Sequence, residues 1–199
     1  NVCHPNYAAY LINKQTLTMK DIEKIIQSIP EEYKVLYDQT LIEQLYARFQ
    51  SKTIDDSAAV AEITETIQGR KLLLLAPGKS LVAEYGAIMD FIDREKPYVI
   101  SVNFVDAKYR MDACFVSNHK RMDNINREIR SLKQIQIILT SNISAGSREG
   151  FLYVDYDRYT NQDKMISDNA GLMLLKLLLR CGAKEIYLAG FDGFHRRHN

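Results

Sequence analysis

Residues suited to phosphate binding follow directly after an apolar run in this 199-residue chain. After Lys71–Ala76 come Pro77-Gly78-Lys79-Ser80, where Gly78 permits close backbone approach and Ser80 opens a helix whose N–H groups attract anions. Hydrogen-bonding side chains recur where other apolar runs end, together with one aromatic residue. These candidate ligand residues are Asn103, Phe104, Ser117, Asn118, Ser141, Asn142 and Asp192.

Spacing excludes two common phosphate-binding motifs. A P-loop needs a glycine five positions before its Gly-Lys pair, but Leu73 stands there, and no G-x-G-x-x-G fingerprint supports NAD or FAD. Lys79 is a solvated charge or one that steers a phosphate. Asparagine, serine and glycine after a strand are more often turn or cap residues than ligands. Their recurrence at five strand ends is what favours a site.

Histidines provide the candidates for acid–base catalysis. His119 follows a predicted strand directly and is the one we name, whereas His195 and His198 belong to a basic tail. The catalytic residues otherwise stay unknown. Cys3 and His4 are adjacent, and no second ligand pair lies near them in sequence, so we expect a structural role and no metal site.

Periodicity indicates the elements that position these residues. From Arg70 onward, apolar runs of five to eight residues alternate with amphipathic segments, as in βα units with a mostly parallel sheet. We predict strands at Lys71–Ala76, Tyr98–Phe104, Ala113–Ser117, Ile135–Thr140, Phe151–Asp155 and Glu185–Ala189. We predict helices at Ser80–Arg94, Lys120–Leu132 and Asp168–Cys181, and irregular connections at Ser141–Gly150 and Arg158–Ile166. The fold class is α/β, with a Rossmann-like sheet and helices on both of its faces.

The segment from Asp168 to Phe194 carries the strongest pattern. Its helix is apolar on all sides, which predicts packing against a sheet, and Gly182 supplies a left-handed cap. The following run, Glu185–Ala189, lacks alternation and predicts a strand covered on both faces. By contrast, Tyr153, Tyr156 and Tyr159 alternate. They indicate an edge strand or a lid over a sugar, and we favour the edge strand.

Residues 1–69 are predicted to form a helical segment that precedes a sheet domain at 70–199. Its helices are predicted near Pro5, from Thr18 to a stop at Pro30, over Asp38–Ser51, and up to Gly69. Because the sequence begins at Asn1 without methionine, we expect a fragment of a longer chain.

Composition excludes several partners. Twenty-six basic and 25 acidic residues leave no charged stripe for nucleic acid, and no run reaches the length of a membrane helix. Three widely separated cysteines and the lack of a signal region predict a reducing, cytoplasmic location. Neither nucleic acid nor membrane is an expected partner, and a homo-oligomer is left open.

The sheet domain resembles two families. The segment from Gly171 to Phe194, with Gly182 and then Lys-Glu-Ile-Tyr-Leu-x-Gly-x-Asp, is similar to bacterial sialyltransferases of the Campylobacter type and to archaeal-type hydroxymethylpterin diphosphokinases. In those transferases a Gly-x-Gly-Pro-Ser-Leu loop helps to hold CMP, and Gly78, Ser80 and Leu81 match it. Asn103 matches an asparagine that reaches the nucleotide phosphate, and Asn169-Ala170-Gly171 stand where the family has Ser-Ser-Gly. The resemblance implies a CMP-like ligand, with Asn169 and Gly171 in its site, and no catalytic residue is carried over.

The first fifty residues resemble another family. The run Cys3–Leu11, with Leu17, Asp21-Ile22 and Leu45-Tyr46, resembles the helical segment after the barrel in HMG-CoA-lyase-like aldolases of the 4-hydroxy-2-oxovalerate type. This implies the C-terminal region of an aldolase fusion, with its divalent metal and active site upstream and no cofactor in the present chain. The leading hypothesis is an accessory or second catalytic domain that binds a nucleotide or phosphorylated metabolite. The alternatives are a glycosyl- or diphospho-transferase with a nucleotide donor, and a non-catalytic module that docks the aldolase barrel through the N-terminal helices.

Overall fold

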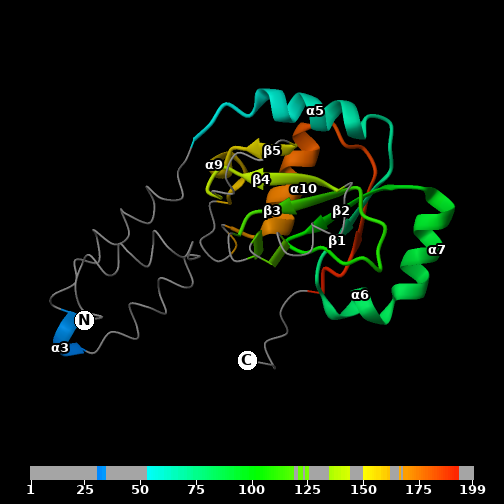
Figure 1. Ribbon diagram of the computed structural model, residues 1–199, viewed down its shortest axis with the longest axis horizontal. Coiled ribbons are helices and arrows are strands. Elements are labelled where there is room, and N and C mark those ends of the chain that lie inside the picture. The colour runs from blue at the N-terminus through cyan, green and yellow to red at the C-terminus, as the bar shows by residue number, and fades with distance from the viewer. Residues whose placement is uncertain are drawn as a thin grey trace.

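One parallel sheet organises the chain. The computed structural model describes residues 31–34, 53–118, 121–122, 124–125, 135–143, 150–161, 166 and 168–192. Six strands lie in the order β5-β4-β3-β2-β1-β6, and every neighbouring pair is parallel. The predicted α/β, Rossmann-like class is confirmed (Figure 1).

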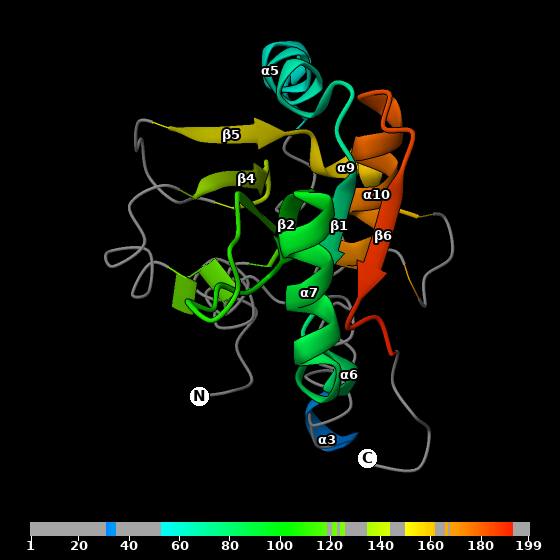
Figure 2. The same cartoon turned by 90° about the vertical axis from the view of Figure 1, so that its right-hand side faces the viewer.

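All six strands lie within the ranges that the apolar runs predicted. They are β1 Leu72–Leu75, β2 Tyr98–Val102, β3 Ala113–Val116, β4 Gln136–Thr140, β5 Phe151–Val154 and β6 Ile186–Ala189. Every residue of β1, β2 and β3 is buried, because helices or loops cover both faces of these central strands. The sheet is strongly twisted, so that β5 and β6 at its two edges point in very different directions (Figure 2).

Helices cover both faces of the sheet. The described helices are α3 Glu31–Lys34, α5 Ser57–Ile67, α6 Lys79–Ala83, α7 Tyr85–Glu95, α9 Tyr156–Tyr159 and α10 Ala170–Arg180. Side chains of α5, α9 and α10 share one apolar core with the sheet, and side chains of α6 and α7 share the other. Figure 2 shows α7 and α10 on opposite sides of β1 and β6. None of these helices is long and apolar enough to span a membrane.

The predicted helix Ser80–Arg94 is divided in two. Glu84 leaves helical geometry at φ −105° and ψ 20°, and its N–H donates to Ser80 O at 2.8 Å, which ends α6. The next residue, Tyr85, packs edge-on against Tyr109 with ring centroids 5.4 Å apart. This contact ties the start of α7 to the loop after β2, so tertiary packing breaks a segment that is helical by pattern.

The closing segment departs from its predicted burial. Gly182 has φ +77°, and its N–H donates to Leu179 O at 3.0 Å, as expected of the left-handed cap. However, the Leu179 side chain of α10 is 64% exposed and Leu188 of β6 is 52% exposed. The helix packs against the sheet as predicted, but it is not buried on its outer face, and the prediction of a strand covered on both faces is wrong. β6 is an edge strand, and α10 covers its inner neighbours more fully.

The tyrosine alternation spans two elements. β5 ends at Val154 as an edge strand, and Asp155 then caps α9 by accepting a hydrogen bond from Arg158 N at 2.9 Å. Tyr156 and Tyr159 lie on this helix and are buried in the core, 6% and 2% exposed. The edge-strand prediction is confirmed for Tyr153, which lies on β5. It is wrong for Tyr156 and Tyr159, because Asp155 caps a helix that contains both.

Only part of the N-terminal prediction falls within the described residues. The helices expected near Pro5, over Thr18–Pro30 and over Asp38–Ser51 lie outside them, while α3 begins directly after Pro30. The fourth predicted helix is α5, whose Ile63 and Ile67 are buried against the sheet. α5 thus packs in the apolar core of the sheet, although it precedes residue 69. The domain boundary at residue 69 stays a prediction. Of the predicted helix Lys120–Leu132, residues 121–122 and 124–125 are described and helical.

A buried charged network joins α5, α9 and α10. Asp56, 1% exposed at the start of α5, accepts hydrogen bonds from Arg180 Nη1 at 2.9 Å, Tyr159 OH at 3.0 Å and Asp155 N at 3.2 Å. Arg180 Nη1 also donates to Tyr159 OH at 2.6 Å. Burial raises the pKa of Asp56, but the hydrogen bonds from Arg180, the Asp155 backbone and Tyr159 outweigh it, and the net pKa is lowered. The carboxylate is therefore stable in its charged form.

Replacement of Asp56 by alanine should destabilise the protein. It would leave Arg180 and the Tyr159 hydroxyl without their shared acceptor, and we expect a loss of about 2–3 kcal/mol of unfolding free energy. The expected loss is smaller than the loss on breaking a fully buried ion pair, because the Arg180 side chain is 33% exposed and water can partly replace its partner. Urea denaturation measures the loss. Asp55→Ala is the control, since Asp55 is exposed and, within the described residues, forms hydrogen bonds with Ser57 alone. An equal loss in both variants would contradict the role of the network.

The same carboxylate should contribute to acid sensitivity. Because the folded pKa of Asp56 lies below its unfolded value of about 3.9, its stabilisation is complete above that pH and is lost as the pH falls through the folded pKa. Asp56→Asn removes this titration. We expect the gap in melting temperature between wild type and Asp56→Asn to be constant from pH 7 to about 5 and to narrow below pH 4. A gap independent of pH down to acid unfolding would show that Asp56 does not titrate as described.

Candidate functional site

The strand order reverses at β1. The chain adds β2, β3, β4 and β5 on one side of β1, and then returns through α9 and α10 to place β6 on the other side. In open parallel sheets, ligands bind beyond the carboxyl ends of the strands at such a reversal. The residues predicted after β1 and β6, Gly78, Lys79, Ser80 and Asp192, lie at this point, which we call the switch point.

Two glycines let the loops of the switch point touch. Gly78 N donates to Gly190 O at 3.0 Å, and Ala76 N donates to Ala189 O at 2.9 Å, so the β1–β6 ladder continues past both strands. A Cβ on Gly78 would lie 2.2 Å from Gly190 O, and one on Gly190 would lie 1.9 Å from Ala76 O. The close backbone approach predicted for Gly78 is present, and its nearest neighbour is the protein's own chain.

Asp192 bridges the switch point. Its carboxylate accepts hydrogen bonds from Ser80 N at 2.7 Å, from the Ser80 hydroxyl and from the Lys79 backbone. Hydrogen bonds from the Ser80 side chain and backbone, and then from Lys79, lower the pKa of Asp192. The backbone N–H groups predicted to attract a phosphate are therefore bound to a carboxylate of the same chain. An anion would have to replace or adjoin this carboxylate to use them.

The start of α10 packs beside this loop. Asn169 caps α10 by accepting a hydrogen bond from Leu172 N at 3.1 Å. A Cβ on Gly171 would lie 2.7 Å from Cε1 of Phe191, so the glycine leaves room for that ring. Asn169 therefore caps the helix, and Gly171 makes room for Phe191, the residue that precedes Asp192.

Asn103 holds an uncommon backbone conformation at the end of β2. Its φ of +61° is left-handed, a region that asparagine tolerates better than most residues. Its N–H donates to Phe115 O at 2.8 Å, and its side-chain Oδ1 accepts from Ser117 N at 3.0 Å. Among the residues described, its side-chain Nδ2 donates no hydrogen bond. Within the described part of the chain, this strand end therefore carries an unused hydrogen-bond donor.

The ends of β3 and β4 form a connected polar chain. Asn142 Nδ2 donates to Ser117 O at 3.3 Å, and Thr140 Oγ1 donates to Asn142 Oδ1 at 2.5 Å. Ser141 Oγ accepts from Tyr156 N at 3.0 Å. Thr140, Ser141, Asn142 and Ser117 are all buried. These contacts hold the strand ends in place, and most of the polar atoms are already used within the protein.

Other predicted residues have local roles or lie outside the description. The Asn118 carbonyl accepts from Arg121 N and Met122 N at 3.1 Å, and the Phe104 carbonyl accepts from Cys114 Sγ at 3.3 Å. His119 lies outside the described residues, as do Cys3, His4, His195 and His198. The described residues contain no cluster of three or more potential metal ligands.

Sequence reasoning missed Thr140 and the link between Ser80 and Asp192. Thr140 ends a predicted strand, but nothing marks it as the partner of Asn142. Ser80 and Asp192 are separated by 112 positions, and their contact depends on β6 returning beside β1. Each residue was identified separately by its place after a strand.

Comparison of the chain with protein-family models, curated proteins and solved structures gives no match.

The loop contact makes a prediction about Gly190. Gly190→Ala would place a Cβ 1.9 Å from a backbone carbonyl at a φ of +76°, and should lower the unfolding free energy by more than about 2 kcal/mol. Gly86→Ala is the matched control, because Gly86 is in α7 with no atom within 4 Å of the added Cβ. It should stabilise by up to about 1 kcal/mol. Chemical denaturation compares the two, and similar effects of the same sign would contradict the contact.

Proposed function

We propose that the sheet domain binds a nucleotide or a phosphorylated metabolite beyond the carboxyl ends of β1, β2 and β6. The observation that carries the proposal is the reversal of strand order at β1, with Ser80 and Asp192 at this position and Asn103 after the adjacent strand. The resemblance to aldolases and nucleotide-using transferases gives its setting: an accessory or second catalytic domain of a 4-hydroxy-2-oxovalerate-type aldolase, with a CMP-like ligand.

The available polar groups favour a ligand that has a phosphate group at one end and a sugar at the other. Asn103 Nδ2 is a donor with no partner in the described part of the chain, and Lys79 is exposed with no ion pair there. These groups suit phosphate oxygens. The carboxylate of Asp192 is an acceptor and suits the hydroxyl groups of a sugar. In this arrangement the phosphate lies toward β2 and the sugar toward β6.

The left-handed backbone of Asn103 supports a binding role for this residue. A non-glycine residue in this region costs about 1–3 kcal/mol, and such strain is concentrated at functional sites. The side-chain bond to Ser117 N helps to hold the conformation and leaves Nδ2 for a ligand. A glycine would relieve the strain but would provide no carboxamide.

Asn103→Asp tests the phosphate contact. The aspartate keeps an acceptor for Ser117 N and tolerates the left-handed backbone, but replaces the available N–H donor by a negative oxygen. With CMP, CDP, ATP and phosphorylated sugars as probes, we expect thermal stabilisation of the wild type by at least one of them, and binding at least about tenfold weaker in the variant by calorimetry. Gln68→Glu, which adds the same charge at the exposed end of α5, should bind like the wild type. Equal affinities in Asn103→Asp and wild type would remove Asn103 from the site.

A companion variant locates the phosphate. Asp192→Asn removes the negative charge at Ser80 and keeps an acceptor, so it should weaken a ligand whose sugar hydroxyls bind there and tighten one whose phosphate binds there. We expect weakening. If well-folded protein binds none of the probes, the proposal fails. The alternative of a non-catalytic module that docks an aldolase barrel would then be favoured. Turnover of a nucleotide donor with an acceptor sugar would favour the transferase alternative.

A further inference from the structure

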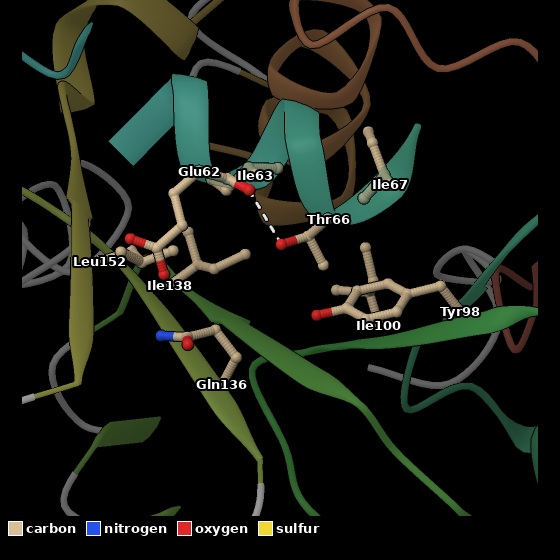
Figure 3. Close-up of a pocket in the computed structure, with 9 residues that line it drawn as sticks. All are labelled: Glu62, Ile63, Thr66, Ile67, Tyr98, Ile100, Gln136, Ile138 and Leu152. Carbon is tan, nitrogen blue, oxygen red and sulfur yellow. Dashed lines mark hydrogen bonds between the residues drawn. The ribbon is translucent and has the colours of Figure 1, made fainter. Parts of the chain in front are cut away.

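A small pocket lies beneath α5, at the edge of the sheet where β2 and β4 begin. It has a volume of about 100 Å³ and opens between α5 and strands β2, β4 and β5. Figure 3 shows isoleucine and leucine side chains around it, with the side chains of Glu62, Tyr98 and Gln136 among them. This is the end of the strands opposite to the switch point, so the pocket is separate from the site proposed above.

Side chains of α5 and of three strands line the pocket. β2 and β4 contribute Ile100 and Ile138, and β5 contributes Leu152. α5 covers them with Ile63 and Ile67, which are both 3% exposed.

Tyr98 is a buried residue whose hydroxyl has no hydrogen-bond partner among the described residues. Tyr98 is 9% exposed, and Figure 3 shows its hydroxyl directed into the pocket. Arg70 lies 5.4 Å from its ring centroid, yet no residue in the described ranges forms a hydrogen bond with the hydroxyl. Buried polar groups nearly always have a protein or solvent partner, and an exception calls for an explanation.

The remaining polar groups of the pocket are mainly acceptors. Gln136 Nε2 donates to Gly150 O at 2.6 Å, which leaves its side-chain oxygen as an acceptor. The Thr66 hydroxyl donates to Glu62 O at 2.8 Å and retains its lone pairs. The carboxylate of Glu62 makes no ion pair within the described residues. A molecule that complements this set must donate hydrogen bonds and would gain from a positive charge.

We propose that the pocket beneath α5 binds a small primary amine, with its ammonium group among Glu62, Tyr98 and Gln136 and a short aliphatic body against Ile100 and Ile138. The volume equals roughly three water molecules, enough for about a four-carbon chain. The isoleucine side chains would contact the body of the ligand, and the acceptors would orient its charged end.

Three probes of equal shape test this assignment. n-Butylammonium, n-butanol and butyrate are titrated into the isotopically labelled 199-residue protein, and amide and methyl NMR shifts are followed on α5, β2 and β4. The ammonium should cause saturable shifts there at millimolar concentration, the alcohol should bind more weakly, and butyrate should cause none. Identical shifts for all three probes, or no saturable shift with the ammonium, would overturn the proposal.

Two conservative variants assign the contacts. Tyr98→Phe keeps the ring and removes only the hydroxyl, so it should fold normally and weaken ammonium binding by up to about tenfold. Glu62→Gln should weaken the ammonium and leave the alcohol unchanged, because Glu62 is exposed and contributes charge. Unchanged ammonium affinity in both Tyr98→Phe and Glu62→Gln would place the amine elsewhere and overturn the assignment.

Discussion

Contact between the backbone segments after β1 and β6 holds the polar edge of the sheet together. Gly78 and Gly190 each lack the Cβ that would collide with the opposite segment. Because the two segments touch, the ladder extends past both strands and brings the Asp192 carboxylate to the start of α6. Phe191 fills the space that Gly171 leaves at the start of α10. The positions of α6, α10 and Asp192 therefore depend on one close approach.

At the β5 edge of the sheet, a buried network of charged hydrogen bonds joins the elements, in place of a close backbone contact. Asp56 joins α5 to α9 and α10, and Asp155 joins α9 to the segment before α5 through Ile54 N at 2.9 Å. A buried carboxylate is stable only if its hydrogen bonds compensate for lost hydration. Arg180, Tyr159 and the Asp155 backbone provide that compensation here. This network closes the layer of helices over β5, the last strand on this side of the sheet among the described residues.

The strands could be predicted because local sequence determines them. Each is a short apolar run between polar segments, and burial of such a run needs no knowledge of its partner. Exposure of Leu188 could not be predicted, since an edge strand and a central strand share the same apolar pattern. Likewise, the pairing of Asp56 with Arg180 could not be predicted, because the two residues lie 124 positions apart. The polar residues of the candidate site were recognised by their place after strands, whereas the pairing of Ser80 with Asp192 follows from topology.

The ionisation of the switch point favours ligand holding over proton transfer. A general acid or base works best with a pKa near the operating pH. Hydrogen bonds from Ser80 and Lys79 lower the pKa of Asp192, which keeps it charged at neutral pH and makes it a poor base. Asn103 and Ser80 contribute neutral hydrogen-bonding groups. This chemistry can orient a charged ligand and a sugar but provides little means to move a proton.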